Sequence, residues 1–567
     1  MPLVGSQTTS VIAQIALDLP LDQCFDYLAP GVGQDAIGRL AVVPFGNRLL
    51  VGLIVRVGTT SALPLKKLKP ITRVCTETPA FSAADLSLFD FCARYYHQPL
   101  GQIVLNAVPP MLRQAKAAPA PKPARIVAIT DSGRTQLGLM PKNRLVQIRL
   151  LAALAAAPAN EADLLRLATT AKTALAILAA QGWVSITEIA MVAATCAPET
   201  LSPPPPPKFD ARYTLNAMQA EALALITAAR DRFQAFSLIG ITGSGKTEVY
   251  LHAMAEALAR GKQALMLVPE INLSPALVRA VAARFPGAVV AQLHSGMASA
   301  PRKNAWLAAQ AGQAHIVVGT RLAVFTPMPR LGIIIADEEH DGSYKQQEGL
   351  RYSARDVAVF RASEARCAVV LGSATPSFET LHNIAQARFT EIKLNLRAVQ
   401  DATLPMVDFV DLNAVRAPDG LTPNMVGAIK ETIARGEQAL VFINRRGYAP
   451  ALVCAQCGEM PGCQRCTARL AFHQKAQRLK CHHCGFQGRV PTSCEHCGSP
   501  ELIAAGHGTE RVEEALQRAL PELRMARVDR DSTREKGSVE KVFQALEKGE
   551  LDVLVGTQML AKGHDFP

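Results

Sequence analysis

Eight cysteines are arranged in pairs that could bind metal ions. Each pair has the form Cys-x-x-Cys, and the pairs are Cys454/Cys457, Cys463/Cys466, Cys481/Cys484 and Cys494/Cys497. Thiolates bind Zn²⁺ well, and two such pairs supply the four sulfurs of a closed tetrahedral site. A redox function would need only one pair. The sequence therefore predicts two structural zinc sites, while the spacing alone leaves sequential, alternating and nested pairing open.

A glycine-rich segment, GITGSGKT at 240–247, could bind phosphate groups. Gly240, Gly243 and Gly245 allow backbone N–H groups to surround phosphate oxygens at the start of a helix, where the helix dipole favours anions. Lys246 can reach the β and γ phosphates, and the Thr247 hydroxyl can bind Mg²⁺. Because a strand-like run precedes the segment and a helical pattern follows it, the sequence predicts a site for ATP and Mg²⁺.

An acidic pair ends the apolar run LGIIIAD further along the chain. Asp337 is placed to hold Mg²⁺ through water, and Glu338 is placed to orient or deprotonate an attacking water. We therefore expect Lys246, Asp337 and Glu338 to be catalytic. Gln219, in YTLNAMQAEAL, stands where a glutamine can read the adenine edge, although a lone glutamine on a helix is more often a surface residue.

The elements that must position these residues alternate along the chain. From 209 to 395, short β-branched runs such as HIVVGT alternate with Ala-rich helical stretches, a pattern typical of a parallel α/β sheet. A second such series occupies 396–567 and contains the cysteine pairs in an insert at 451–500. The predicted fold class is multidomain α/β, with two RecA-like parallel-sheet lobes, of which the second is incomplete.

Two smaller domains are predicted before the lobes. Residues 1–115 begin with alternating apolar and polar positions, as in LLVGLIVRV, and should form a β-rich domain. Residues 125–200 contain three helix-like runs followed by GWVSITEIA, which we expect to be a β hairpin. This is the outline of a winged helix, which can bind duplex DNA or pack against protein. The proline run makes 201–208 an extended linker.

Composition limits the class of protein further. The 567 residues carry a formal net charge of +12, which suits a polyanionic partner but would equally suit a soluble basic surface. The cysteines outside the four pairs are scattered, unlike those of a secreted disulfide framework. The sequence has no signal-peptide pattern and no apolar run long enough to span a membrane. We therefore expect a cytoplasmic protein.

The motifs resemble those of a known helicase family. In order, Gln219, GITGSGKT, LVPEINLSPAL, VVGTRLAVF, DEEH, GSATPS, FINRRGYAP and VGTQMLAKGHDFP resemble the motifs of superfamily 2 helicases. The stretch DEEHDGSYKQQEGLRYSARD and the cysteine insert narrow the resemblance to the PriA family of replication-restart helicases, and it runs along the whole chain. It implies an ATP-dependent 3′→5′ DNA helicase that recognises stalled or abandoned forks and initiates primosome assembly to reload the replicative helicase.

The same resemblance implies partners and a location. The partners would be branched and single-stranded DNA, the single-stranded DNA-binding protein, other primosomal proteins and the helicase-loading machinery. The location would be the bacterial cytoplasm, in association with the nucleoid. An alternative from another class is a fork-binding scaffold that assembles the primosome without unwinding DNA.

Several DNA-contacting residues follow from the resemblance alone. A pocket for the 3′ end of a nascent strand matches Phe25, Asp26, Tyr27, Gly46 and Lys69, although aromatic residues of a small β domain are more often core. Residues 343–355 are similar to the family's aromatic-rich loop, which couples DNA binding to hydrolysis. Leu350 stands there in place of the usual Trp, which leaves Tyr344 and Tyr352 as stacking rings. Arg321, Ser373, Thr375 and Thr557 would also bind DNA or couple it to the nucleotide.

The resemblance also implies how the cysteines pair and what lies beyond the last motif. It favours nesting, with Cys454, Cys457, Cys494 and Cys497 on one ion and Cys463, Cys466, Cys481 and Cys484 on the other. After GHDFP the family has a further motif, which supplies an arginine to the γ-phosphate, and a carboxy-terminal domain. Because this sequence ends at Pro567, we expect a truncated form that binds ATP but hydrolyses it poorly.

Overall fold

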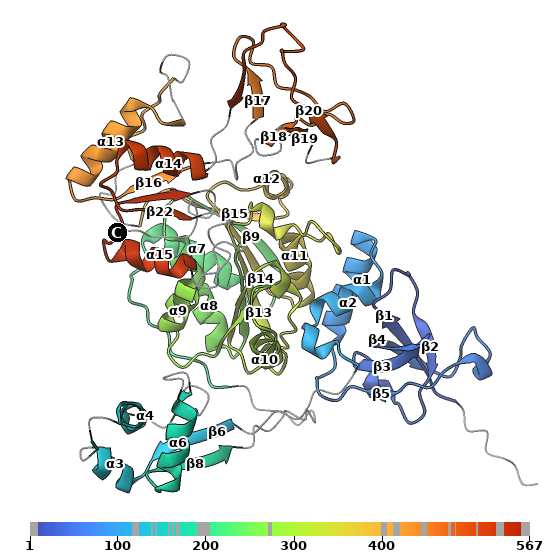
Figure 1. Cartoon of the computed structure of the whole chain (residues 1–567). Coiled ribbons are helices and arrows are strands. Elements are labelled where there is room, and N and C mark those ends of the chain that lie inside the picture. Colours follow the sequence, from blue (N-terminus) through green and yellow to red (C-terminus); the bar gives the residue numbers. More distant parts are fainter. Residues whose placement is uncertain are drawn as a thin grey trace, which may run out of the picture. The chain divides into compact units, whose positions relative to one another are not determined.

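The computed structural model of the chain (Figure 1) divides into two compact units, residues 1–400 and 401–567, which are described separately. The structure describes residues 10–115, 124–137, 140–141, 144–156, 159–160, 164–165, 170–189, 204–269, 275–398, 405–411, 415, 420–443, 451–473, 478–481, 484–505, 509–528 and 538–556. None of the helices in these ranges is long and apolar enough to cross a membrane.

The N-terminal domain is built on a five-stranded antiparallel sheet in the order β2-β1-β4-β3-β5. The strands are β1 (Ile12–Leu17), β2 (Phe25–Leu28), β3 (Leu40–Phe45), β4 (Arg48–Gly58) and β5 (Arg73–Val74). Alternate residues of β1 face opposite sides, since Ala13 and Ile15 enter one buried cluster and Ala16 enters another. The predicted β-rich domain is confirmed.

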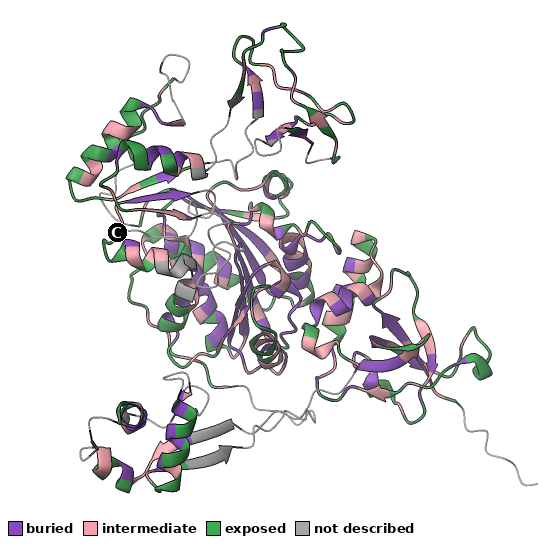
Figure 2. Cartoon of the chain, viewed as in Figure 1, coloured by how far each residue is buried: buried purple, intermediate pink, exposed green. Residues whose placement is uncertain are grey.

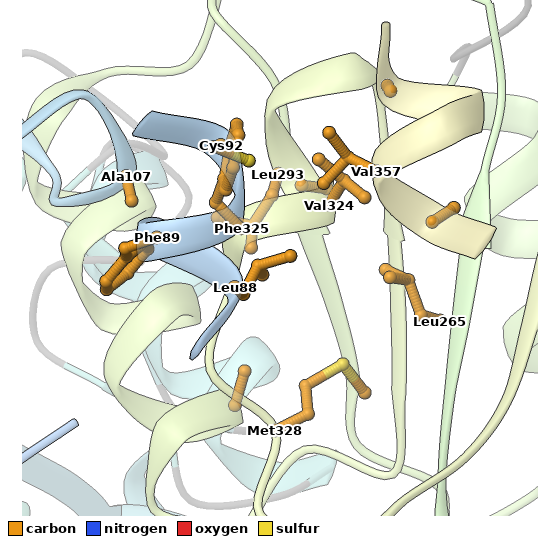
Figure 3. Close-up of a cluster of buried hydrophobic side chains, with 14 of the residues drawn as sticks. Leu88, Phe89, Cys92, Ala107, Leu265, Leu293, Val324, Phe325, Met328 and Val357 are labelled. Carbon is orange, nitrogen blue, oxygen red and sulfur yellow. The ribbon is translucent and has the colours of Figure 1, made fainter. Parts of the chain in front are cut away.

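Two helices, α1 (Ala83–Tyr96) and α2 (Leu100–Ala107), follow this sheet. A capping box between Ser82 and Asp85 starts α1, and His97 ends it in the left-handed conformation. The apolar side chains of both helices are buried together with those of the first α/β lobe. Figure 3 shows Leu88 of α1 in the same buried cluster as Phe325 of the lobe. The N-terminal domain and the lobe therefore share a hydrophobic core.

A small α+β domain lies between the N-terminal domain and the lobe in sequence. It contains β6 (Ala124–Ile129), α3 (Asp131–Leu137), α4 (Leu145–Ala156), β7 (Ala159–Asn160), α6 (Ala171–Ala180) and β8 (Val184–Ile189). Its antiparallel sheet has the order β7-β6-β8. The expected hairpin in GWVSITEIA is therefore wrong: this segment is one strand, and it pairs with the distant β6. The winged-helix assignment stays a prediction.

The first α/β lobe is a seven-stranded parallel sheet in the order β11-β12-β10-β13-β14-β9-β15. The strands are β9 (Gln234–Gly240), β10 (Gln263–Leu267), β11 (Val290–Leu293), β12 (Ile316–Gly319), β13 (Leu331–Asp337), β14 (Ala368–Ser373) and β15 (Thr390–Leu394). The central strands are almost entirely buried (Figure 2), because helices cover both faces of the sheet.

The central strands of this sheet contribute alternately to two cores. Ile333 and Ile335 pack on one face, and Ile334 and Ala336 pack on the other. Residues of α7 (Ala217–Ala228), α8 (Lys246–Ala259) and α9 (Pro275–Arg284) share the first core, whereas residues of α10 (Ser299–Gln310) and α11 (Ala354–Glu364) share the second. Helix α12 (Phe378–Ala385) follows β14. The carboxyl ends of β9, β13 and β14 carry the predicted nucleotide motifs, so the fold brings these motifs to one edge.

The second unit contains a parallel sheet and an antiparallel insert. The parallel sheet has the order β16-β23-β22, with β16 (Ala439–Phe442), β22 (Met525–Val528), β23 (Val553–Gly556) and helices α13 (Pro423–Ala434), α14 (Thr509–Ala519) and α15 (Ser538–Glu547). The insert is a five-stranded sheet in the order β20-β19-β18-β17-β21, with β17 (Ala451–Cys454), β18 (Ala471–His473), β19 (Arg478–Lys480), β20 (Gln487–Arg489) and β21 (Leu502–Ala505). As predicted, the cysteine-rich module interrupts an α/β lobe.

Candidate functional sites

The glycine-rich segment forms a phosphate-binding loop between β9 and α8. Gly243 and Gly245 have φ of +78°, a left-handed conformation that side chains rarely adopt. A Cβ on Gly240 would overlap the Ser244 side chain. Helix α8 begins at Lys246 without a side-chain cap, so its first amides are available to an anion. Lys246 Nζ donates a hydrogen bond of 3.0 Å to the Gly240 carbonyl, which keeps the ammonium within the loop. Thr247 follows in the first turn of α8.

Gln219 supports this loop from helix α7. Its side-chain oxygen accepts from the Asn216 amide at 2.9 Å, and its Nε2 donates to the Ser244 carbonyl at 2.9 Å. The side chain is buried, and a Cβ on Gly245 would collide with it. Both the oxygen and the nitrogen of the Gln219 side chain thus form hydrogen bonds within the protein. The predicted adenine contact would instead need this amide to face the base. Its adenine contact stays a prediction.

Asp337 and Glu338 lie at the carboxyl end of β13, where the sequence places them. Tyr250, on the second turn of α8, donates a hydrogen bond of 3.1 Å from its hydroxyl to Asp337 Oδ1. Burial and the neighbouring Glu338 charge raise the pKa of Asp337 from 3.8 to about 6, although Tyr250 and Lys246 oppose the shift. Glu338 itself has φ of +48°, a strained conformation that often marks functional sites. The loop, α8 and β13 therefore meet around one buried carboxylate.

The segment after β14 contacts the acidic motif directly. His340 Nδ1 lies 2.7 Å from Ser373 Oγ and 3.5 Å from the Glu338 carboxylate. Ser373 Oγ also accepts from the Thr375 amide at 2.9 Å. Ser373 and Thr375 are thereby joined to the acidic motif through His340, and their coupling to the nucleotide site stays a prediction.

Glu339 is a functional candidate that sequence reasoning missed. Its side chain is fully buried and accepts from the Ser377 amide at 2.8 Å and from the Ser377 hydroxyl at 3.0 Å. The Arg355 guanidinium lies 3.3 Å from the same carboxylate. A buried carboxylate with three donors fixes the position of its surroundings. Glu339 therefore connects the acidic motif to the GSATPS segment and to the start of α11.

The aromatic-rich loop has its apolar side chains turned inward. Tyr344, Leu350 and Tyr352 are 2%, 6% and 1% exposed, so none of them can stack on DNA in this conformation. In this structure both rings belong to the core that the lobe shares with α1, so the stacking of Tyr344 and Tyr352 on DNA stays a prediction. The Tyr344 hydroxyl lies 2.6 Å from the Asp337 carbonyl oxygen. Arg321 holds the loop by donating to Gln346 Oε1 at 2.6 Å.

The aromatic residues predicted for the 3′-end pocket lie on and beside β2. The Phe25 ring makes an edge contact with Phe45, with 5.2 Å between ring centroids. Phe45 precedes Gly46, which turns the chain from β3 to β4 with φ of +57°. Tyr27 is buried and donates from its hydroxyl to the Pro44 carbonyl at 3.2 Å. The structure thus brings Phe25 beside the Gly46 turn, while Tyr27 belongs to the core.

The polar members of the predicted pocket lie on β2 and in the segment that pairs with its end. Asp26 accepts from the Ser61 hydroxyl at 2.6 Å through Oδ2. Asp26 Oδ1 is buried and has no hydrogen-bond partner among the described residues. Lys69 is exposed, and its carbonyl accepts from the Leu28 amide at 2.9 Å, which ties its segment to the end of β2. A buried acceptor without a donor is costly unless a ligand supplies one.

The cysteines of the insert form two separate clusters of sulfur atoms. One contains Cys454, Cys457, Cys494 and Cys497, and the other contains Cys463, Cys466, Cys481 and Cys484. The shortest separations are 3.5 Å between Cys454 and Cys497 and 3.5 Å between Cys466 and Cys481, too long for disulfides. Two sulfurs on one tetrahedral Zn²⁺ lie about 3.8 Å apart. These clusters fit zinc, and their grouping is the nested arrangement that the resemblance implies.

One predicted residue lies outside the described part of the chain. This is Thr557, which follows β23 directly. The segments FINRRGYAP and VGTQMLAKGHDFP also lie almost entirely outside the described ranges.

Three models of protein families match this chain. The DEAD/DEAH box helicase model matches residues 216–384, the 3′ DNA-binding domain of PriA matches 14–109, and the Cys-rich region of the PriA DNA helicase matches 463–489. The parallel sheet and its phosphate loop thus define a DEAD/DEAH-type helicase lobe. Among solved structures, that of RecG bound to a three-way DNA junction matches 64% of this chain and 40% of its own, at 15% identity and a TM-score of 0.35.

Curated relatives specify the family. The replication restart protein PriA of Haemophilus influenzae is 37% identical over 562 residues, covering 98% of this chain and 75% of that protein. The Treponema pallidum protein of the same name is 32% identical, covering 98% and 72%. The Bacillus subtilis protein is 43% identical over 342 residues, covering 59% and 42%. The chain belongs to the PriA family of replication restart helicases.

Proposed function

We propose that the chain acts as an ATP-dependent 3′→5′ DNA helicase at stalled or abandoned replication forks, where it initiates primosome assembly. The helicase activity in this proposal is supported by the series of side-chain contacts around Asp337. Tyr250 joins the phosphate-loop helix to Asp337, and His340 joins the acidic motif to Ser373. A change at the phosphates can therefore reach the segment that follows β14 through side chains already in contact.

The residues of the loop fit ATP and Mg²⁺. The uncapped amides of α8 and the Lys246 ammonium would bind the β and γ phosphates, and the Thr247 hydroxyl with Asp337 would hold Mg²⁺. Bound Mg²⁺ would neutralise phosphate charge in the transition state. Glu338 would accept the proton of the attacking water. His340, 3.5 Å from Glu338, would orient that carboxylate.

The N-terminal domain would bind the 3′ end of a nascent strand. The buried Asp26 Oδ1 lacks a donor among the described residues, and a terminal 3′-hydroxyl would supply one. Phe25 would stack on the last base and Lys69 would face a phosphate. The two zinc ions would be structural, since a closed Cys₄ set leaves no position for a substrate water. The single-stranded DNA-binding protein and the primosomal proteins remain proposed partners.

Unwinding of a forked duplex tests this function against the scaffold alternative. A motor should unwind the fork with ATP and lose that activity in Lys246→Ala, while fork binding persists. A scaffold should bind the fork equally well in both proteins and unwind in neither. Unwinding by Lys246→Ala at the rate of the unaltered chain would contradict the motor. ATP turnover by the unaltered chain on the same fork shows whether unwinding follows hydrolysis.

A further inference from the structure

The aromatic-rich loop is folded back on itself between the acidic motif and α11. Its two sides meet at a bridge between Lys345 and Ser353, and the Gln346 amide donates to the Tyr352 carbonyl at 2.9 Å. Lys345 Nζ also donates to the Arg351 carbonyl at 2.6 Å, which ties the sides together again. The loop is therefore a closed element that can be held or released as one piece.

One end of this loop reaches the nucleotide site. The Asp341 side chain accepts from the Ser343 amide at 2.8 Å, which fixes the start of the loop directly after the acidic motif. The Tyr344 hydroxyl lies within hydrogen-bond distance of two carbonyl oxygens, 2.6 Å from that of Asp337 and 2.9 Å from that of Leu267. Closure of the loop thus places Tyr344 against the backbone of Asp337, the residue whose carboxylate would bind Mg²⁺.

The other end of the loop is held by the N-terminal domain. Tyr96, the last residue of α1, accepts a hydrogen bond of 3.2 Å at its hydroxyl from the Ser353 amide. Lys345 Nζ lies 5.5 Å from the centre of the Tyr96 ring, within the range of a cation–π contact. Tyr96 therefore touches both residues of the bridge that closes the loop.

Further contacts hold α1 in the position from which Tyr96 reaches the loop. The Phe91 ring stacks on Phe360 of α11, with centroids 3.8 Å apart and planes 6° apart. Helix α11 begins immediately after the loop, and Ser353 caps it by accepting from the Asp356 amide. Phe89, one turn before Cys92, lies in the shared core shown in Figure 3. Movement of α1 relative to α11 would therefore disturb the loop through Tyr96.

We propose that Tyr96 is a positioning residue through which the N-terminal domain holds the aromatic-rich loop closed. In the closed state Tyr344 and Tyr352 are buried, so any contact of these rings with DNA requires the loop to open. DNA captured by the N-terminal domain would loosen α1 and release the loop. The structural part of this proposal is independent of the proposed function, whereas release of the loop by DNA rests on the DNA binding proposed there for the N-terminal domain.

Hydrogen exchange of the 343–353 backbone tests the proposal in the full chain. Tyr96→Phe keeps the ring but removes the acceptor for the Ser353 amide. The loss of one hydrogen bond should accelerate exchange of the loop about fivefold. Tyr95→Phe is the matched control, because Tyr95 is 60% exposed and its hydroxyl makes no hydrogen bond with the described residues. The peptide 331–337 of β13 should exchange equally in all three proteins.

Two outcomes would overturn the proposal. The first is unchanged exchange of 343–353 in Tyr96→Phe and also in Tyr96→Ala, with β13 still protected. The second is the same acceleration in Tyr95→Phe. A DNA titration adds a second measurement, which would not change if Tyr96 had only a structural role. The DNA concentration that gives half-maximal exchange of the loop should fall in Tyr96→Phe, while affinity for ATP stays unchanged.

Discussion

Replacing Asp337 by Asn should stabilise the nucleotide-free chain at neutral pH. In the folded protein, burial and the Glu338 charge raise the pKa of this carboxyl from 3.8 to about 6. Ionised Asp337 therefore costs stability, and the cost grows as pH rises through about 6. At about 1.4 kcal/mol per pKa unit, the cost is about 3 kcal/mol at pH 8 and about half of that at pH 5. Asn keeps an oxygen for the Tyr250 hydroxyl but carries no charge.

Thermal unfolding of both proteins without nucleotide, at pH 8 and pH 5, measures this effect. Asp337→Asn should melt several degrees above the unaltered chain at pH 8, and the difference should narrow at pH 5. Asp35→Asn, at an exposed carboxylate, is the control and should change little at either pH. Saturating Mg²⁺ and ATP should stabilise the unaltered chain more than the variant, since the ligand binds only the folded site. A melting temperature of Asp337→Asn below that of the unaltered chain would refute this reasoning. So would a difference in melting temperature that is the same at both pH values.

Three further changes have expected outcomes. Gly372→Ala places a Cβ on the Tyr250 hydroxyl, so it should displace that ring and cost about 1–3 kcal/mol in urea unfolding; unchanged stability would contradict the packing. Glu339→Ala leaves Arg355 without its buried partner and should cost about 3–5 kcal/mol in the same assay, whereas a neutral effect would rule out the network. Cys494→Ser should lower the zinc content from two ions per chain to about one by elemental analysis, and retention of two would argue against the nested clusters.

The features that the sequence predicted well are local ones. The phosphate loop needs glycines at fixed positions next to a strand and a helix, and all of these lie within one short segment. The strands of the first lobe are buried on both faces, so their apolar runs identify them directly. The cysteine spacing indicates two Cys₄ sets because each pair forms a local turn. The choice of nesting required the resemblance, since the partners lie up to 43 positions apart.

The features that the sequence predicted poorly depend on distant partners. The pairing of β8 with β6 joins segments more than 50 positions apart, which a local hairpin pattern cannot reveal. The Gln219 side chain donates a hydrogen bond to the Ser244 carbonyl, and no sequence pattern around either residue predicts this contact. Tyr344 and Tyr352 stand among polar neighbours that suggest exposure, but distant parts of the lobe bury them: Tyr352 packs edge-on against Phe325, and the Tyr344 hydroxyl lies 2.9 Å from the Leu267 carbonyl oxygen. Glu339 could not be predicted because its partners Ser377 and Arg355 lie 38 and 16 positions away in the sequence.

Binding of a fluorescent ATP analogue with Mg²⁺ tests the nucleotide-driven motor most directly, because it does not depend on turnover. The unaltered chain should bind the analogue, a DNA duplex with an exposed 3′ end should change its affinity, and Lys246→Ala should abolish binding while the protein stays folded. Equal binding by the two proteins, or an affinity that the DNA leaves unchanged, would contradict a motor in which the 3′-end domain and the ATP site are linked.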